Sequence, residues 1–206
     1  MISWTIGYWF IGEVLTDPDY LTNAYAQKNR IFFGVLFELV DVAAVMGITV
    51  LMYPIIKKFN ETLALGYVAL RILECALLII AIMGALSVIT LSREFIAAGS
   101  PDNTHFQTLG TTMLEIRENW VHLVLPFFYS LASFIFYYFF YKTKLIPRPI
   151  AIWGLIASSL VLTGIPMDFF EFKPGAFVGA AMGLTELVLG IWLIVKGFNT
   201  PEGDLT

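Results

Sequence analysis

The stretch YVALRILECALLII, residues 67–80, is apolar except for one arginine, one glutamate and the chain's single cysteine. It lies inside a longer apolar run, Leu63–Leu91, which exceeds the ~20 residues that a helix needs to cross ~30 Å of hydrocarbon. Charged side chains in the middle of such a run are costly unless other polar groups accompany them. The stretch therefore predicts a membrane-spanning helix with a polar centre.

The composition of the whole chain agrees with a membrane protein. Of its 206 residues, 58% are hydrophobic and 14% are charged, and the mean hydropathy is +0.79. Long apolar runs recur without a separate polar half, so we expect a single transmembrane domain over residues 1–206. The first residues lack a basic leader and a cleavage site, so we expect them to be retained. A single cysteine excludes an intrachain disulfide and a CxxC redox pair.

Five segments are each near or above the length of a full membrane span, and a shorter one precedes them. The short segment, Ile2–Leu15, fits a tilted span, an interfacial helix or the remnant of a longer span. The predicted fold is therefore an all-α, polytopic transmembrane helix bundle of five full spans plus a short N-terminal sixth. The five full spans are Ile31–Tyr53, Leu63–Leu91, Trp120–Tyr141, Pro149–Ile165 and Ala176–Phe198.

The charges between the spans predict the orientation of the chain. The positive-inside rule places the basic loops and the C-terminus in the cytoplasm, so the acidic loops face outward. The largest outward loop, at about 92–119, contains a turn signal, GSPDN, followed by residues that can extend the next helix outward. The basic residues on the cytoplasmic side are Lys57, Lys58, Lys142, Lys144, Arg148 and Lys196.

Ionisable residues inside the predicted spans form a candidate buried polar site. Arg71 and Glu74 are three residues apart and share one helix face with Cys75, which we interpret as a small core residue. The predicted spans contain one guanidinium, on Arg71, and four carboxylates. An unpaired charge at mid-bilayer costs at least a few kcal/mol. We expect some of the acids to be protonated, to be hydrated or to hold a cation. The site consists of Glu38, Asp41, Arg71, Glu74, His122 and Glu186.

Two interpretations of these residues remain open. In the first, Arg71 pairs with one or two glutamates to set the helix register while the other acids stay neutral. In the second, the residues are functional, as is usual for ionisable groups inside a membrane. For His122, near the outer rim, a hydrogen bond is favoured over metal ligation. Close helix packing is predicted at the small-residue stripe beside Glu186, which comprises Gly179, Gly183 and Gly190.

Several enzyme classes lack their required residues. Only His105 and His122 are present, without an HxxxH or HExxH motif, which argues against membrane zinc hydrolases and bis-histidine haem. No serine lies in a glycine-rich turn with a facing histidine. We expect no cofactor, no metal and no nucleic-acid partner, we assign no catalytic residue, and the sequence favours a non-enzyme. The expected partners are membrane lipids and either a second copy or another membrane protein.

Three stretches resemble the bacterial DUF4386 family of small multi-pass membrane proteins. The resemblance runs from Tyr20 onward, and its most specific parts are the R-x-x-E of Arg71 and Glu74, the P-R and W-G of Pro147–Gly154, and the terminal W-L-I-V-K-G-F. It implies a polytopic helical protein of the bacterial plasma membrane. The family is uncharacterised, so no role is implied for any residue, and members usually begin with a fuller first span. The stretches are MYPIIKKFNETLALGYVALRILECALL (52–78), KTKLIPRPIAIWGLI (142–156) and TELVLGIWLIVKGF (185–198).

The residues leave three hypotheses about function. The leading one is an outward-opening polar site that binds or passes a proton, a cation or a small amphiphile. The alternative is a non-catalytic structural or partner-docking protein that uses the glycine stripe and the aromatic helix PFFYSLASFIFYYFF. A lipid-modifying enzyme with Glu74 or Glu186 as general base is the weakest, because no nucleophile or metal set accompanies these acids.

Overall fold

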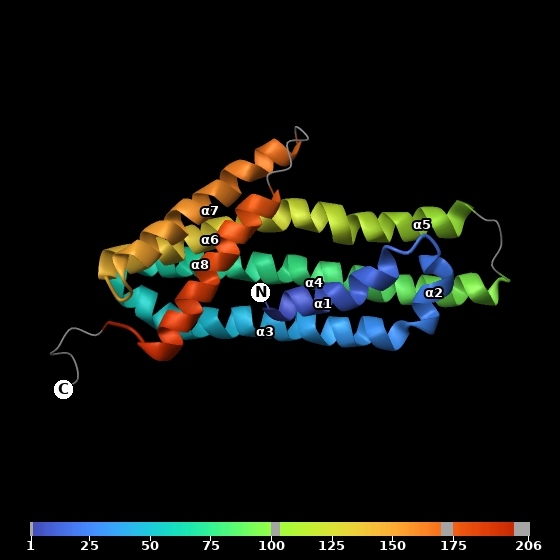
Figure 1. Ribbon diagram of the computed structural model, residues 1–206, viewed down its shortest axis with the longest axis horizontal. Coiled ribbons are helices and arrows are strands. Elements are labelled where there is room, and N and C mark those ends of the chain that lie inside the picture. Colours follow the sequence, from blue (N-terminus) through green and yellow to red (C-terminus); the bar gives the residue numbers. More distant parts are fainter. Residues whose placement is uncertain (1, 100–103, 170–174, 200–206) are drawn as a thin grey trace. The chain divides into compact units, whose positions relative to one another are not determined.

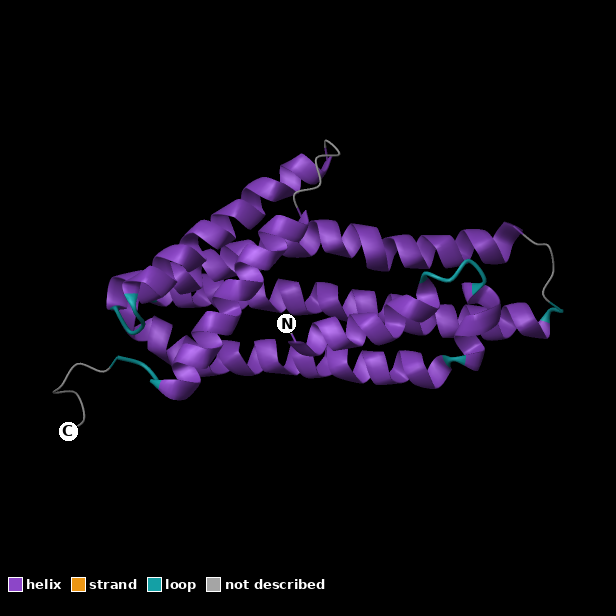
Figure 2. Ribbon diagram, viewed as in Figure 1, coloured by secondary structure: helices purple, strands orange, loops and turns teal. Residues whose placement is uncertain are grey.

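Helices form all the regular secondary structure in the described part of the chain, so the predicted all-α fold is confirmed (Figures 1 and 2). The computed structural model describes the backbone of residues 2–99, 104–169 and 175–199, and the side chains of residues 3–99, 105–164 and 180–199. The helices are α1 (Ile2–Leu15), α2 (Tyr20–Ala26), α3 (Lys28–Phe59), α4 (Glu61–Ala97), α5 (Thr104–Glu115), a π-helical turn (Ile116–Trp120), α6 (Val121–Thr143), α7 (Arg148–Phe169) and α8 (Gly175–Val195).

Among the residues whose side chains the structure describes, three helical segments are long and apolar enough to cross a membrane: α3, α4 and the continuous His105–Thr143. At 1.5 Å per residue, α3 and α4 extend roughly 48 and 55 Å, which exceeds the hydrocarbon thickness of a bilayer. Two shorter apolar stretches, Arg148–Gly164 and Ala180–Val195, belong to α7 and α8. Large aliphatic side chains are exposed along these helices, so much of their surface is unsuited to water.

The helices coincide with the predicted spans but differ at their ends. The helix predicted from Trp120 does extend toward its N-terminus, as α5 and the π-helical turn, while α2 lies in a segment predicted as a loop. The loop predicted at about 92–119 is therefore much shorter, since α4 continues to Ala97. The last helix ends at Val195 rather than Phe198 because Gly197, with φ of 70°, adopts the left-handed conformation typical of helix C-termini.

Contacts divide the chain into two compact units that interleave along the sequence. Unit 1 comprises Met1–Ile48 and Leu73–Leu125, and unit 2 comprises Thr49–Ile72 and Pro126–Thr206. The helices α3, α4 and α6 contribute to both units. Each unit has its own apolar core: Ile11, Ile31 and Val88 are buried in unit 1, and Phe139 and Phe140 in unit 2. Cys75 is buried in the core of unit 1.

In unit 1, α1 packs closely against α3 through two glycines. A Cβ atom added at Gly7 would lie 2.7 Å from the Gly34 carbonyl oxygen and 2.8 Å from Cγ of Glu38. Only a residue without a side chain permits this approach. The ends of the contact are held by a hydrogen bond from the Ser3 hydroxyl to the Phe37 carbonyl oxygen and by an ion pair between Arg30 and Glu13. Helix α1 therefore covers the side chain of Glu38.

Candidate functional site

A buried ion pair between Arg117 and Glu38 lies at the centre of unit 1. Nη2 of Arg117 donates to Oε1 of Glu38 at 2.5 Å and Nη1 donates to Oε2 at 3.2 Å, and both side chains are 0% exposed. The same guanidinium donates from Nη1 to the Ala81 carbonyl oxygen at 2.9 Å and from Nε to Oε1 of Glu118 at 3.0 Å. Arg117 thus joins α3, α4 and the π-helical turn through one planar set of donors.

The local geometry of Arg117 follows from the π-helical turn. The backbone N–H of Val121 donates to the Ile116 carbonyl oxygen, five residues back. Such a turn inserts one extra residue and disturbs the regular carbonyl pattern, often at functional sites. Nδ1 of His122 lies 3.0 Å from the carbonyl oxygens of both Arg117 and Glu118. Because carbonyl oxygens only accept, Nδ1 carries the proton and Nε2 is the nitrogen that remains to be protonated.

Helix α1 closes this group of residues from one side. The Tyr8 hydroxyl donates to Oε2 of Glu118 at 2.8 Å. The rings of Trp4 and Tyr8 both meet the His122 ring edge-on, with centroids 6.0 Å apart. We name Tyr8, Glu38, Arg117, Glu118 and His122 the Arg117 network. It contains two carboxylates and one guanidinium, so it carries one net negative charge while His122 is neutral.

A second polar cluster lies in unit 2. The Arg71 guanidinium carbon is 5.4 Å from the ring centroid of Tyr67 and 5.7 Å from that of Tyr129, within the range of cation–π attraction. The Tyr129 hydroxyl donates to Oε1 of Glu186 at 2.5 Å. Tyr67 is fully buried, and its hydroxyl has no hydrogen-bond partner within the described residues. We name Tyr67, Arg71, Tyr129 and Glu186 the Arg71 cluster.

Comparison with known protein families now adds to this geometry. The sequence model of a domain of unknown function, DUF4386, matches residues 1–197. The chain belongs to the DUF4386 family. No curated protein and no solved structure matches it. Arg71, which belongs to the most specific part of the DUF4386 resemblance, lies in the Arg71 cluster. Gly154, from another such part, lies against the Tyr137 ring in unit 2, where a Cβ would overlap that ring.

The six site residues predicted for this DUF4386 chain divide between the two units. Glu38 and His122 belong to the Arg117 network, whereas Arg71 and Glu186 belong to the Arg71 cluster. In unit 1, Asp41 is half-buried and Glu74 is 4% exposed. The hydrogen bond expected at His122 is present.

Sequence reasoning missed the residue at the centre of the network. The expectation of a single cation among the buried acids is wrong, because Arg117, assigned to an outer loop, is completely buried. Glu118 and Tyr8 were also missed. One signal in the sequence could have indicated Arg117. The residues before Trp120 were expected to extend the next helix, and such an extension places Arg117 on a helix rather than in a loop.

The predicted close packing at the glycine stripe of α8 is supported at one glycine but not at another. Gly183 is buried, but a Cβ at Gly190 would meet no atom within 4 Å. The surroundings of Gly179 lie outside the described residues. Close packing of another helix on this stripe therefore stays a prediction.

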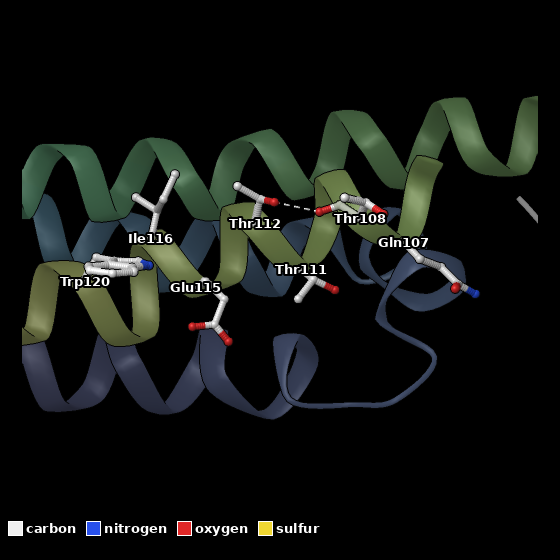
Figure 3. Close-up of a pocket in the computed structure, with 7 residues that line it drawn as sticks. All are labelled: Gln107, Thr108, Thr111, Thr112, Glu115, Ile116 and Trp120. Atoms are coloured by element: carbon white, nitrogen blue, oxygen red, sulfur yellow. Dashed lines mark hydrogen bonds between the residues drawn. The ribbon is translucent and has the colours of Figure 1, made fainter. Parts of the chain in front are cut away.

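The outer surface of α5 carries an open groove of about 530 Å³ (Figure 3). The Thr112 hydroxyl donates to the Thr108 carbonyl oxygen at 2.8 Å along this face. A smaller pocket of about 270 Å³ between α2, Phe95 and α5 shares Gln107 and Thr111 with the groove. Among the described residues, no group of three or more His, Cys, Asp or Glu side chains is placed to hold a metal ion. The groove is lined by Gln107, Thr108, Thr111, Thr112, Glu115, Ile116 and Trp120.

Proposed function

We propose that this DUF4386 chain is a multi-pass protein of the bacterial plasma membrane whose polar interior binds or passes a proton, a cation or a small amphiphile. Five spans are supported by the three long apolar helices and by the 22 and 21 residues of α7 and α8, each sufficient for about 30 Å of hydrocarbon. By the positive-inside rule, we expect the basic residues between the spans to keep the C-terminus in the cytoplasm. The proton is the ligand that the Arg117 network supports best.

The charge imbalance of the Arg117 network is the observation that supports proton binding. Glu38 faces the guanidinium from α3, Tyr8 faces Glu118 from α1, and α4 contributes the uncharged Ala81 carbonyl oxygen. One negative charge is left on a group of side chains whose central ion pair is fully buried, and uncompensated charge inside a membrane is costly. A proton on Glu118, or on Nε2 of His122, makes the network neutral. The half-buried Asp41 and the buried Glu74 add further acids to unit 1.

Direct measurement of proton uptake tests this function. The purified chain in lipid nanodiscs is titrated from about pH 8 to pH 5, the range in which such sites act, with a soluble indicator dye. We expect the chain to take up about one more proton than Glu118→Gln, in which the network is already neutral. The matched control is Glu94→Gln, which removes an exposed acid paired with Arg93 elsewhere in unit 1. Equal uptake by the unaltered chain, Glu118→Gln and Glu94→Gln would overturn the proposal.

A structural role is the second candidate, and one observation favours it. Arg117 makes four hydrogen bonds to three different elements and holds them in register, as a buried ion pair can do without further activity. Exposed aliphatic residues on α8, such as Leu184, Ile191 and Ile194, offer a surface for a second copy or another membrane protein. A cross-linked oligomer that is lost in Gly183→Leu, together with unchanged proton uptake in Glu118→Gln, would establish this role instead.

A further inference from the structure

The pocket between α2 and α5 is lined by several polar side chains that do not bond to one another or to the rest of the described chain. Within the described residues, the exposed side chains of Asp19, Gln107 and Thr111 line this pocket and make no hydrogen bond to protein atoms. Beneath them the Tyr20 hydroxyl is buried against Gly110, which leaves room for it, and also lacks a partner. A buried hydroxyl without a partner costs about 1–3 kcal/mol. The pocket therefore holds hydrogen-bonding capacity that the described chain does not use.

The chemistry of these groups selects the ligand. Asp19 supplies a full negative charge, and none of the residues lining the pocket or the adjoining groove is basic. The carboxylate, the amide oxygen and the Thr111 hydroxyl all accept hydrogen bonds. An anion is repelled here, and a metal ion lacks the carboxylate and imidazole ligands it needs. A primary ammonium group, with three donors and a positive charge, complements this set.

The groove along α5 provides space for whatever carries the ammonium group. Gln107 and Thr111 line both the pocket and the groove, so the two cavities adjoin there. The groove passes a further acid, Glu115, and ends at the apolar side chains of Ile116 and Trp120 (Figure 3). From Gln107 to Trp120 the helical rise is roughly 20 Å. A ligand with a polar amine end and a less polar remainder fits this gradient.

We propose that the adjoining pocket and groove bind a primary ammonium compound, with Asp19 as counter-ion and Gln107 and Thr111 as hydrogen-bond acceptors. Either a free amine or the head group of an aminophospholipid carries this chemistry. The site contains no residue of the Arg117 network, so it does not depend on the proposed proton binding. Failure of one proposal leaves the other standing.

Thermal unfolding of the full chain tests the site. In phosphatidylcholine nanodiscs, ethanolammonium chloride should raise Tm saturably, because a ligand of the native state stabilises it by mass action. Tetramethylammonium chloride, which cannot donate a hydrogen bond, should not. Asp19→Asn should weaken the apparent affinity at least about tenfold, the effect of losing roughly 1.4 kcal/mol, and Gln107→Leu should weaken it less. Glu94→Gln, an equal charge change outside both cavities, should bind as the unaltered chain does.

A second arm separates the two sources of the amine. A higher Tm in phosphatidylethanolamine than in phosphatidylcholine nanodiscs, lost in Asp19→Asn, identifies the lipid head group. Stabilisation by free ethanolammonium without a lipid effect identifies a soluble amine. The proposal is overturned if neither source stabilises the chain, if tetramethylammonium acts equally, or if Asp19→Asn responds like the unaltered chain. Because Asp19 is exposed and asparagine has its shape, this variant is expected to fold.

Discussion

Arg117 carries a full positive charge at a position where neither it nor Glu38 reaches solvent. Burial of both ions is expensive, and their mutual attraction compensates for it only when the remaining donors are also satisfied. The Ala81 carbonyl oxygen and Glu118 supply those acceptors. The pair is therefore stable as a complete set, and removal of either member alone leaves a buried charge.

We expect Arg117→Met to destabilise the chain by about 3–5 kcal/mol, because it leaves Glu38 as an uncompensated buried carboxylate. The double variant Glu38→Met/Arg117→Met should recover most of that loss. Reversible unfolding in mixed micelles measures both. The explanation fails if the single variant costs less than about 1 kcal/mol or if the double variant is no better than the single one.

Tyr129→Phe tests a single hydrogen bond of the Arg71 cluster. Removing the hydroxyl deprives Glu186 of a donor at 2.5 Å, so a loss of about 1–3 kcal/mol is expected. Tyr141→Phe, on the same helix but at an exposed position, should stay within about 0.5 kcal/mol of the unaltered chain. Similar losses in the two variants would show that the Tyr129 bond contributes no specific stabilisation.

At the scale of elements, α1 and the π-helical turn enclose the Arg117 network. The close crossing at Gly7 lets α1 lie directly over Glu38, and Tyr8 reaches Glu118 from the same helix. The extra residue of the π-helical turn places Arg117 toward α3 and α4 while the chain continues into α6.

Gly7→Ala should displace α1, because the new Cβ would approach the Gly34 carbonyl oxygen to 2.7 Å. Overpacking of this kind costs about 1–3 kcal/mol. Gly47→Ala is the matched control, since a Cβ there meets nothing within 4 Å and alanine favours the helix. Hydrogen exchange should increase in α1 for the first variant alone. Unchanged exchange in Gly7→Ala would contradict the tight crossing.

At the scale of the whole molecule, the proposed orientation can be checked by cysteine labelling. In a Cys75→Ala background, a membrane-impermeant maleimide applied to intact bacterial cells should label Leu109→Cys on α5. It should label Lys58→Cys, at the end of α3, only after the membrane is permeabilised, because the basic loops are expected in the cytoplasm. The reverse pattern would invert the proposed topology.

The apolar runs were sufficient to predict the helices, because the length and hydropathy of a run are properties of contiguous residues. They also singled out Glu38, Arg71 and Glu186, since a charge inside an apolar run is visible without any partner. Arg117 was not visible in this way, because its neighbours Glu115, Glu118 and Asn119 are polar and resemble a loop. Its burial arises from α3 and α4, which pack against the π-helical turn from distant parts of the chain.

The same distinction holds for the arrangement of the polar residues. Helical periodicity showed that Arg71 and Glu74 share a face, but it contains no information about which other helix that face meets. Only tertiary packing divided the polar residues between the Arg117 network and the Arg71 cluster and placed Gly7 over Glu38. Local patterns determine elements and their faces, whereas ion pairs between helices depend on long-range contacts that a single sequence does not specify.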